Sequence, residues 1–240
     1  MTVEPIAARE SQHDRVLAEL GHALLGGEYP AGSVLLAERL AERHRASRSV
    51  IREAVRVLES MGMVTSKRRV GTTVSGRGAW NLFDPRLIRW RLDSSERPDQ
   101  LRSLSELRRA IEPLAARLAA QRISQEQSDR LRSAVLEMTS TARAGDLDAF
   151  LFADVAFHSV ILEASGNEML FDLSSTVAEV LAGRTRHDMM PTHPRDEALS
   201  LHQQVAQHVI AGDDDLAHRD MAAIVDEATG AMATQLTDSE

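Results

Sequence analysis

The sequence predicts a mostly α-helical protein built from an N-terminal winged helix-turn-helix with a small β wing and a C-terminal all-α antiparallel bundle. Three observations lead to this prediction. Apolar residues recur at helical spacing along most of the chain. One short stretch, residues 63–75, reads instead as a hairpin around a basic, glycine-containing tip. The length of 240 residues is sufficient for two hydrophobic cores.

Composition excludes several classes of protein. There is no cysteine, so disulfides, cysteine zinc sites and thiol nucleophiles are ruled out. No apolar run is long enough to span a membrane, and residues 1–10 lack the pattern of a secretory signal. We therefore expect a cytoplasmic protein.

The charge distribution separates the two parts of the chain. Overall the net charge is −8. Residues 43–77 nevertheless carry nine basic residues against two acidic ones, whereas residues 79–240 carry 16 against 27. A basic segment inside an acidic protein predicts one surface that meets a polyanion. The acidic bundle also makes binding to a membrane surface improbable.

The elements of the first domain, residues 10–76, follow one another in a fixed order. A helix over 13–25 stops at two glycines, and a short helix over 36–45 follows a turn. Ser47 is expected to cap a third helix over 50–61, which buries one apolar face made of Ile51, Ala54, Val55 and Leu58. The hairpin comes last.

Residues 77–97 are interpreted as a linker with a short helix, and residues 98–236 as the bundle. Ser124 and Gln127 predict a capping box. The apolar stripe of the first bundle helix consists of Leu101, Leu104, Leu107, Ile111, Leu114 and Leu118. The later helices are expected over 125–144, 147–164, 168 to about 187, 196–210 and 213 to about 237, with a loop at 190–193.

The third helix has the right place in this order to enter the major groove of DNA. Its first turns would expose Arg48, Ser49 and Arg52, and Arg39 on the preceding helix could reach a phosphate or a base. The alternative for any single arginine is a solvated surface charge. The expected contacts of the hairpin tip with the DNA backbone or minor groove are Lys67, Arg68, Arg69 and Gly71.

Metal ligation is a hypothesis for the bundle. Asp154 and His158 are four residues apart and share one face of a helix, and His202 lies on a later helix. An Asp-His pair with a histidine from a facing helix has the spacing of a metal site. The alternative is that these are hydrogen-bonded core residues.

Cationic residues of the bundle are candidates for binding an anion. The apolar stripe places Arg108, rather than Arg109, nearer to the core, where it could hold a carboxylate. Arg184, Thr185 and Arg186 offer positive charge and a hydroxyl at the end of another helix. The alternative there is a basic C-terminal turn stabilised by the helix dipole.

The N-terminal domain resembles the GntR family of winged-helix proteins. The resemblance is carried by residues 29–35 (YPAGSVL), 37–39 (AER), 47–54 (SRSVIREA) and 58–62 (LESMG). Leu36 stands where many members have proline. The resemblance implies that Arg39, Arg48 and Arg52 read an operator and that the tip over 68–71 enters the minor groove. A homodimer is expected, because one winged helix reads only a short half-site.

The C-terminal half resembles the FCD domain of the FadR-like subgroup. The matching residues are 106–108 (ELR), Glu112-Pro113, 154–158 (DVAFH), 164–167 (ASGN), Leu201-His202, Gly212-Asp213 and Met221. Many members hold a divalent metal, zinc or similar, with one Asp and three His. The resemblance thus implies a site of Asp154, His158 and His202, with Ile224 at the usual fourth position. It also places Asn167 among the expected effector-binding residues.

Residues 79–85 and 87–90 resemble the linker of the galactonate-responsive branch. This implies a sugar acid as effector, of the galactonate or gluconate type, and a repressor released by it. Trp80 and Trp90 could equally be packing residues. Other carboxylates (lactate, fatty acid, dicarboxylate) and a metal-responsive sensor stay as alternatives. An enzyme is not expected, because no activated nucleophile, phosphate loop or dinucleotide fingerprint stands out.

Overall fold

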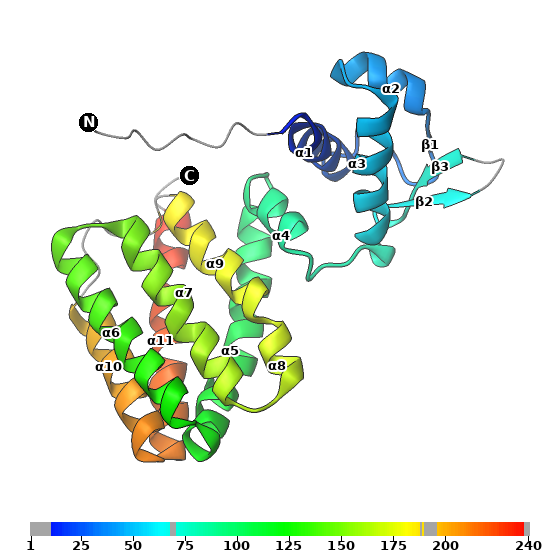
Figure 1. Cartoon of the computed structure of the whole chain (residues 1–240). Coiled ribbons are helices and arrows are strands. Elements are labelled where there is room, and N and C mark those ends of the chain that lie inside the picture. Colours follow the sequence, from blue (N-terminus) through cyan, green and yellow to red (C-terminus); the bar gives the residue numbers. More distant parts are fainter. Residues whose placement is uncertain (1–10, 68–70, 188, 190–195, 238–240) are drawn as a thin grey trace, which may run out of the picture. The chain divides into compact units, whose positions relative to one another are not determined.

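The computed structural model describes residues 11–67, 71–187, 189 and 196–237, which form two compact units (Figure 1). The units comprise residues 1–94 and 95–240. The boundary falls inside the segment 77–97 that the sequence suggests as a linker. The loop expected at 190–193 lies outside the described residues. Within the described ranges, no helix is both long and apolar enough to cross a bilayer.

The first unit combines helices with a three-stranded antiparallel sheet. Its helices are α1 (Gln12–Leu25), α2 (Ala37–His44), α3 (Arg48–Ser60) and α4 (Pro85–Leu92), with a 3-10 turn η1 (Arg77–Ala79). Its strands are β1 (Val34–Leu35), β2 (Val64–Lys67) and β3 (Gly71–Val74), in the order β1-β3-β2. The hairpin of β2 and β3 is confirmed. Strand β1 was not predicted, because two residues are too short to show a period of two.

Helix α3 begins where its cap predicts. The hydroxyl of Ser47 accepts a hydrogen bond from the backbone N–H of Val50 at 3.3 Å, which satisfies one free donor of the first turn. Ile51, Ala54 and Leu58 are buried, as expected from their spacing. Val55, also expected in the core, is only half-buried at the edge of this stripe. The opposite face of α3 is consequently free for a partner.

Helix α4 packs against α1 in the first unit. Leu87 and Trp90 belong to the same core as α1 and α3, and Trp80 is buried there too. The ring of Trp90 lies directly over Gly21, because a Cβ added to Gly21 would come within 2.3 Å of Cζ3 of Trp90. The helix expected within the linker is therefore part of the packed first unit.

This contact predicts an unusual effect of Gly21→Ala. Alanine inside a helix normally stabilises by about 1 kcal/mol over glycine. Here we expect the first unit to lose about 1–3 kcal/mol, because the methyl group overlaps Trp90. Urea unfolding followed by circular dichroism measures the change. In a Trp90→Leu background the same substitution should no longer be costly, and a stabilised single variant would contradict the packing.

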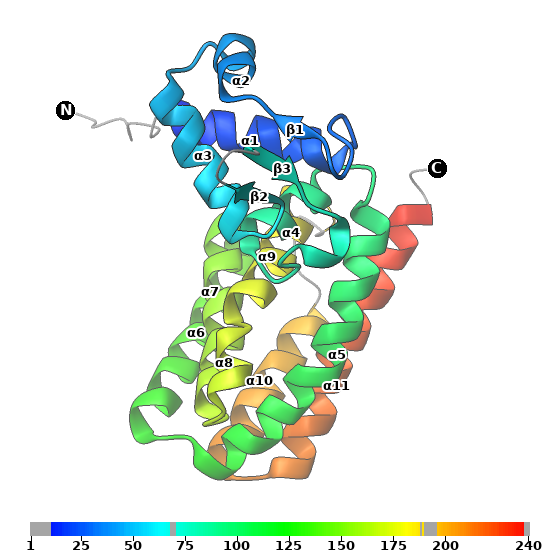
Figure 2. The ribbon, with the colours of Figure 1, turned by 90° about the vertical axis from the view of Figure 1, so that its right-hand side faces the viewer.

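The second unit is an antiparallel helical bundle. Figure 2 shows α5 and α11 running side by side along one edge. The helices are α5 (Arg97–Arg122), α6 (Gln125–Ala144), α7 (Leu147–Ala164), α8 (Glu168–Asp172), α9 (Ser174–Arg186), α10 (Asp196–Ala211) and α11 (Asp214–Thr237). The capping box of Ser124 and Gln127 is confirmed. The prediction of a single helix from 168 to about 187 is wrong, because α8 and α9 are separated at Leu173. No glycine or proline next to Leu173 signals this break in the sequence.

The buried face of α5 differs from the predicted stripe. Leu101 and Leu104 are buried, but Leu114 is 43% exposed and Leu107 is half-buried. Arg108 is buried, as its place beside the stripe predicts, and Glu112 is buried with it. A pattern based on hydrophobicity does not mark Glu112, because charged residues enter a core only when partners compensate them.

Candidate functional site

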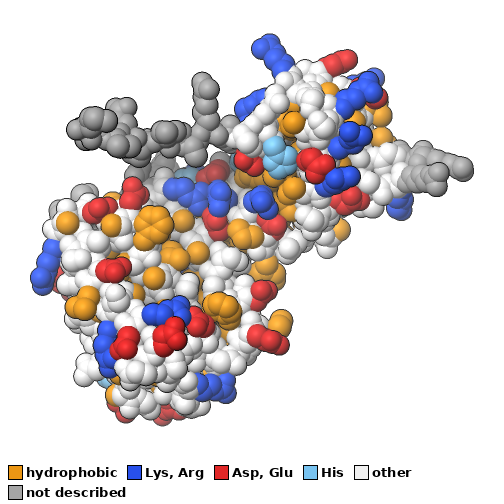
Figure 3. Space-filling model, in the orientation of Figure 1, with side chains coloured by type: hydrophobic (Ala, Val, Ile, Leu, Met, Phe, Trp, Pro, Cys, Tyr) orange, Lys and Arg blue, Asp and Glu red, His pale blue; other side chains and the backbone are white. Residues whose placement is uncertain are grey.

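The exposed face of α2 and α3 carries the predicted DNA-binding residues. Arg39 on α2 and Arg48, Ser49 and Arg52 on α3 are all exposed. A contact of 3.6 Å between Nη2 of Arg48 and Oε1 of Glu38 joins the N-terminal turns of the two helices. Figure 3 shows basic side chains gathered over this part of the first unit.

Some of these cations are held by acidic neighbours and others are not. Arg43 pairs with Glu28, and Arg56 pairs with Glu53. Among the described residues, Arg39, Arg52 and Lys67 form no ion pair, so their donors are available to phosphate or base edges. In the hairpin, Lys67 is exposed at the end of β2, and Gly71 begins β3 with a φ of 92°. Arg68 and Arg69 lie outside the described residues.

Inside the bundle, three predicted metal ligands come together. Asp154 and His158 on α7 and His202 on α10 are all buried. The Oδ1 atom of Asp154 lies 3.4 Å from Nε2 of His158 and 3.4 Å from Nε2 of His202. Each residue offers one possible ligand atom, and these three atoms all lie within 4.8 Å of one another.

The donor set fits a divalent ion such as zinc. Bonds of about 2.0–2.1 Å at tetrahedral angles place ligand atoms roughly 3.3 Å apart, close to the observed spacing. Oδ1 of Asp154 and Nε2 of His202 are buried without a hydrogen-bond partner. Buried polar atoms without partners are costly, and an ion would satisfy both atoms at once.

An acceptor lies beside the other ring nitrogen of each histidine. Nδ1 of His158 lies 2.8 Å from Oε2 of Glu112 on α5, at ion-pair distance but without the alignment of a hydrogen bond. Nδ1 of His202 lies 2.7 Å from the carbonyl oxygen of Ala198. Each acceptor favours a proton on Nδ1, which leaves the lone pair on Nε2, the atom that faces Asp154.

Electrostatics keep the buried carboxylates ionised. Burial alone raises the pKa of Asp154, but the imidazoles of His158 and His202 outweigh it and hold this pKa well below its usual range. Burial likewise raises the pKa of Glu112, and Arg108 and His158 outweigh it to bring this pKa to about 2. Both groups are thus negative at neutral pH and suited to hold a cation.

Arg108 and Arg184 are both buried, but in different surroundings. Arg108 donates from Nε to Oε1 of Glu112 at 2.5 Å and from Nη2 to Oε2 at 3.2 Å. Its burial agrees with the prediction that it, and not Arg109, faces the core; Arg109 pairs with Asp226 at the surface.

Arg184 has no such counter-ion. It is 8% exposed, its Nε lies buried without a hydrogen-bond partner, and no carboxylate of the described residues lies within 4.0 Å. Burial lowers the pKa of Arg184 and the charge of Arg108 lowers it further, whereas the charges of Asp154 and Glu227 raise it from beyond ion-pair distance. A buried guanidinium without a direct ion-pair partner is costly, and its Nε is available to an acceptor.

The remaining predicted residues lie apart from these contacts. The hydroxyl of Thr185 donates to the carbonyl of Leu181, and Arg186 pairs with Glu179. The side chain of Asn167 accepts from the N–H of Met169 and caps α8. Ile224 packs in the core of the bundle, so α11 offers an alkyl group where the resemblance implies a histidine.

Glu112 is the residue that sequence reasoning missed. It was recognised only as part of a matching motif and was given no role. The signal was its spacing of four from Arg108 on the same helix, which predicts an ion pair. Its contact with His158 joins α5 to α7, and no spacing within one helix could reveal it.

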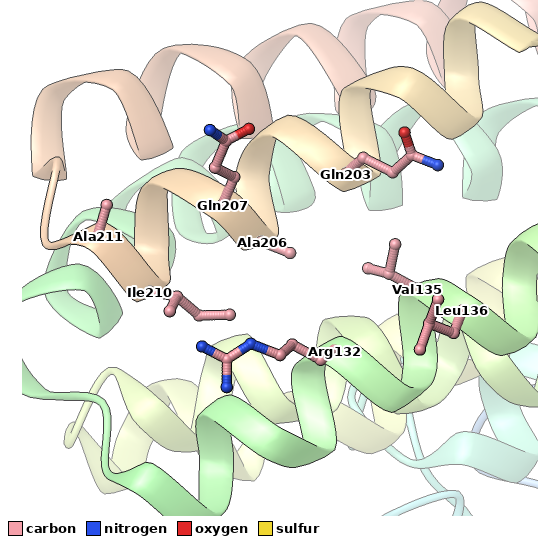
Figure 4. A pocket seen from close by; sticks show the side chains of 8 residues that line it. All are labelled: Arg132, Val135, Leu136, Gln203, Ala206, Gln207, Ile210 and Ala211. Atoms are coloured by element: carbon pink, nitrogen blue, oxygen red, sulfur yellow. The ribbon is translucent and has the colours of Figure 1, made fainter.

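A surface groove lies elsewhere on the bundle, between α6 and α10. It has a volume of about 480 Å³, and Figure 4 shows Ala206 and Ile210 of α10 and Arg132 and Val135 of α6 directed into the space between the two helices, with Gln207 pointing away from it. Leu136 and Ile210 give it an apolar lining, and Gln203 and Arg132 lie at its ends. None of the predicted site residues lines this groove.

Comparison with known families assigns both halves of the chain. The family described as "Bacterial regulatory proteins, gntR family" matches residues 12–74, and the family described as "FCD domain" matches residues 103–227. The chain belongs to the GntR family. Its fold thus joins a GntR winged helix to an FCD bundle, and it belongs with ligand-responsive transcription regulators, not with enzymes.

Individual GntR relatives differ in what their names say they regulate. The galactonate operon transcriptional repressor of Escherichia coli is 33% identical over 168 residues, covering 70% of this chain and 72% of that protein. The putative L-lactate dehydrogenase operon regulatory protein of Escherichia coli is 31% identical over 232 residues, covering 93% and 85%.

Solved structures support the same fold. A GntR protein of Streptococcus agalactiae is 27% identical with a TM-score of 0.50, and the match covers 90% of this chain and 98% of that one. McbR/YncC of Escherichia coli is 18% identical with a TM-score of 0.55, and the match covers 94% of this chain and 99% of that one. At this identity the likeness supports the fold and nothing more.

Proposed function

We propose that this GntR-family regulator binds a palindromic operator as a homodimer and releases it when a small carboxylate enters the bundle. The observation that supports an anionic effector is the buried Arg184 without a counter-ion, on the same helical bundle as the Asp154, His158 and His202 cluster. Two winged helices are needed because each reads only a short half-site. A protein that acts on chromosomal DNA is placed in the cytoplasm.

The proposed operator contacts on α2 and α3 are exposed side chains. Arg48, Ser49 and Arg52 on α3 would enter the major groove, and Arg39 would meet the backbone beside it. Lys67, Arg68, Arg69 and Gly71 form the tip of the wing and would contact phosphates or the minor groove. Binding of this kind weakens steeply with salt, since each phosphate contact releases counter-ions.

The effector site is proposed around the buried cluster. Asp154, His158 and His202 would hold a divalent ion, which supplies positive charge that binds carboxylate and hydroxyl oxygens. Arg184 would bind the carboxylate, and Arg108, Thr185, Arg186 and Asn167 stay as further candidates, although each of these four makes a contact of its own in the structure. A sugar acid of the galactonate or gluconate type combines a carboxylate with several hydroxyls and suits this donor set.

Arg184→Met separates ligand binding from folding. We expect the variant to bind the effector at least tenfold more weakly, because the free guanidinium is lost. We also expect the ligand-free protein to gain at least about 1 kcal/mol in stability, because an uncompensated buried charge is removed. Isothermal titration and thermal unfolding measure the two effects.

Arg186→Met is the matched control, two residues further along α9. Arg186 already pairs with Glu179, so we expect no gain in stability. If Arg186→Met abolished effector binding while Arg184→Met left it intact, the carboxylate would have to be assigned to Arg186.

Fluorescence anisotropy tests the function as a whole. The purified protein is titrated onto its own upstream DNA at several salt concentrations, and galactonate, gluconate and related acids are then added. We expect tight, salt-sensitive binding that one acid releases. Binding that no acid affects would reject the sugar-acid effector, and binding indifferent to salt would reject the phosphate contacts.

A lactate-type effector is the second candidate. It is favoured by the lactate-related relative, whose similarity extends over 93% of this chain. Lactate carries one carboxylate and one hydroxyl, so it could satisfy Arg184 and an ion but would leave no further hydroxyls to bind. The same titration with L-lactate distinguishes the candidates.

A further inference from the structure

Glu112 connects a buried arginine to a candidate metal ligand. Its carboxylate takes both hydrogen bonds from Arg108 and lies 2.8 Å from Nδ1 of His158. The side chains of all three are at most 3% exposed. An ion pair placed this deeply is weak evidence for stability, since the cost of desolvating both charges offsets their attraction. Stability therefore does not explain why Glu112 also contacts His158.

The two histidines of the cluster have the same orientation, with Nδ1 beside an acceptor, but the acceptors differ. Glu112 lies in ion-pair contact with Nδ1 of His158, without the alignment of a hydrogen bond, and the carbonyl of Ala198 is hydrogen-bonded to Nδ1 of His202. Both rings consequently direct Nε2 at the same oxygen of Asp154, at 3.4 Å in each case. A carboxylate behind a ligating histidine fixes its ring orientation and tautomer and increases its basicity.

We propose that Glu112 is a positioning residue of the metal centre, which orients His158 through Nδ1 and is itself fixed by the two hydrogen bonds of Arg108. The inference rests on the metal site of the proposed function and adds the α5 side of the cluster to it. Glu112 does not ligate the ion; it acts through His158. Arg108 acts one step further away, through Glu112.

This arrangement separates the roles of the two buried arginines. Arg108 donates hydrogen bonds from Nε and Nη2 to Glu112, so its main contribution is to the geometry of His158. Nε of Arg184 donates no hydrogen bond. Losing Arg108 should therefore weaken metal binding first, whereas losing Arg184 should weaken effector binding and leave metal binding intact.

The experiment measures metal affinity in Glu112 variants of the full-length protein. Zn²⁺ affinity is determined by competition with a chromophoric chelator, and Co²⁺ absorption reports the ligand geometry. Glu112→Gln keeps the size of the side chain but removes the charge, and we expect zinc to bind 10- to 100-fold more weakly. Glu112→Asp keeps the charge near Arg108 but shortens the reach to His158, and it too should weaken binding and alter the Co²⁺ spectrum. It provides the test if the glutamine variant does not fold.

Asp220→Asn is a matched control for the loss of a buried carboxylate. Asp220 is 4% exposed and lies 2.7 Å from Nδ1 of His208, the same kind of contact away from the cluster. We expect it to lower the unfolding temperature and to leave zinc affinity and the Co²⁺ spectrum unchanged. A merely structural role of Glu112 would give the same result in the Glu112 variants.

The outcomes separate this inference from the proposed metal site. Weaker zinc binding and a changed spectrum in the Glu112 variants, with both preserved in Asp220→Asn, would support the positioning role. Zinc bound equally by wild type and Glu112→Gln would overturn that role alone. Equal weakening in Asp220→Asn would also overturn it, and a wild-type protein without stoichiometric zinc would overturn both.

Discussion

Alanine in place of Arg52 is expected to weaken operator binding by about 1–3 kcal/mol for each protomer of the bound dimer. Arg52 lies in the second turn of α3, exposed, and forms no ion pair among the described residues. Its removal therefore takes away a proposed DNA contact and breaks no ion pair among the described residues. Fluorescence anisotropy with labelled operator measures the loss, and effector binding should be unchanged.

The control for this variant is Arg109→Ala on the bundle. It changes the net charge equally but removes a surface ion pair with Asp226, far in sequence from the DNA-binding helices. Operator affinity should stay within the error of the wild type. If Arg52→Ala lost effector binding and operator binding together, Arg52 would have to be reinterpreted as a residue needed for folding.

The double variant His158→Ala, His202→Ala is expected to lose its metal completely. Two of three ligands disappear, and Asp154 alone cannot hold a divalent ion against solvent water. The stabilisation that added zinc gives the wild type should vanish as well, because an ion that binds only the folded state raises its stability. Elemental analysis after dialysis and thermal unfolding with and without zinc measure these effects.

His218→Ala is the matched control, since His218 lies on α11 outside the cluster of three ligands. It should retain both the metal and the zinc-dependent stabilisation. Stoichiometric metal retained by the double variant would reject the assignment of Asp154, His158 and His202.

Local features of the fold were predictable because they depend on residues close in sequence. Ser47 and Ser124 cap helices within three residues of their own position, and Gly145 ends α6 in the left-handed conformation. Features that depend on distant partners were not predictable. Strand β1 exists only because Val34 pairs with Thr73, and α4 joins the first unit only because Trp90 finds space over Gly21.

The candidate site also has features that depend on nearby residues and features that depend on distant partners. The spacing of Asp154 and His158, with His202 on a later helix, predicted that the three side chains could meet, and left hydrogen-bonded core residues as the alternative to metal ligands. The family resemblance added the expectation of a metal, and Ile224 marked the departure. The apolar pattern around Arg108 also placed it in the interior.

The sequence by itself thus determined the order of elements, the family and the polar residues available to a site. Only the tertiary structure decided what these residues contact. Glu112 became part of the cluster because α5 packs beside α7, and Arg184 became distinctive because no described acidic residue lies within ion-pair distance of it. The physical reason is that caps and i,i+4 pairs are local interactions, whereas the compensation of a buried charge depends on side chains that folding brings from other helices.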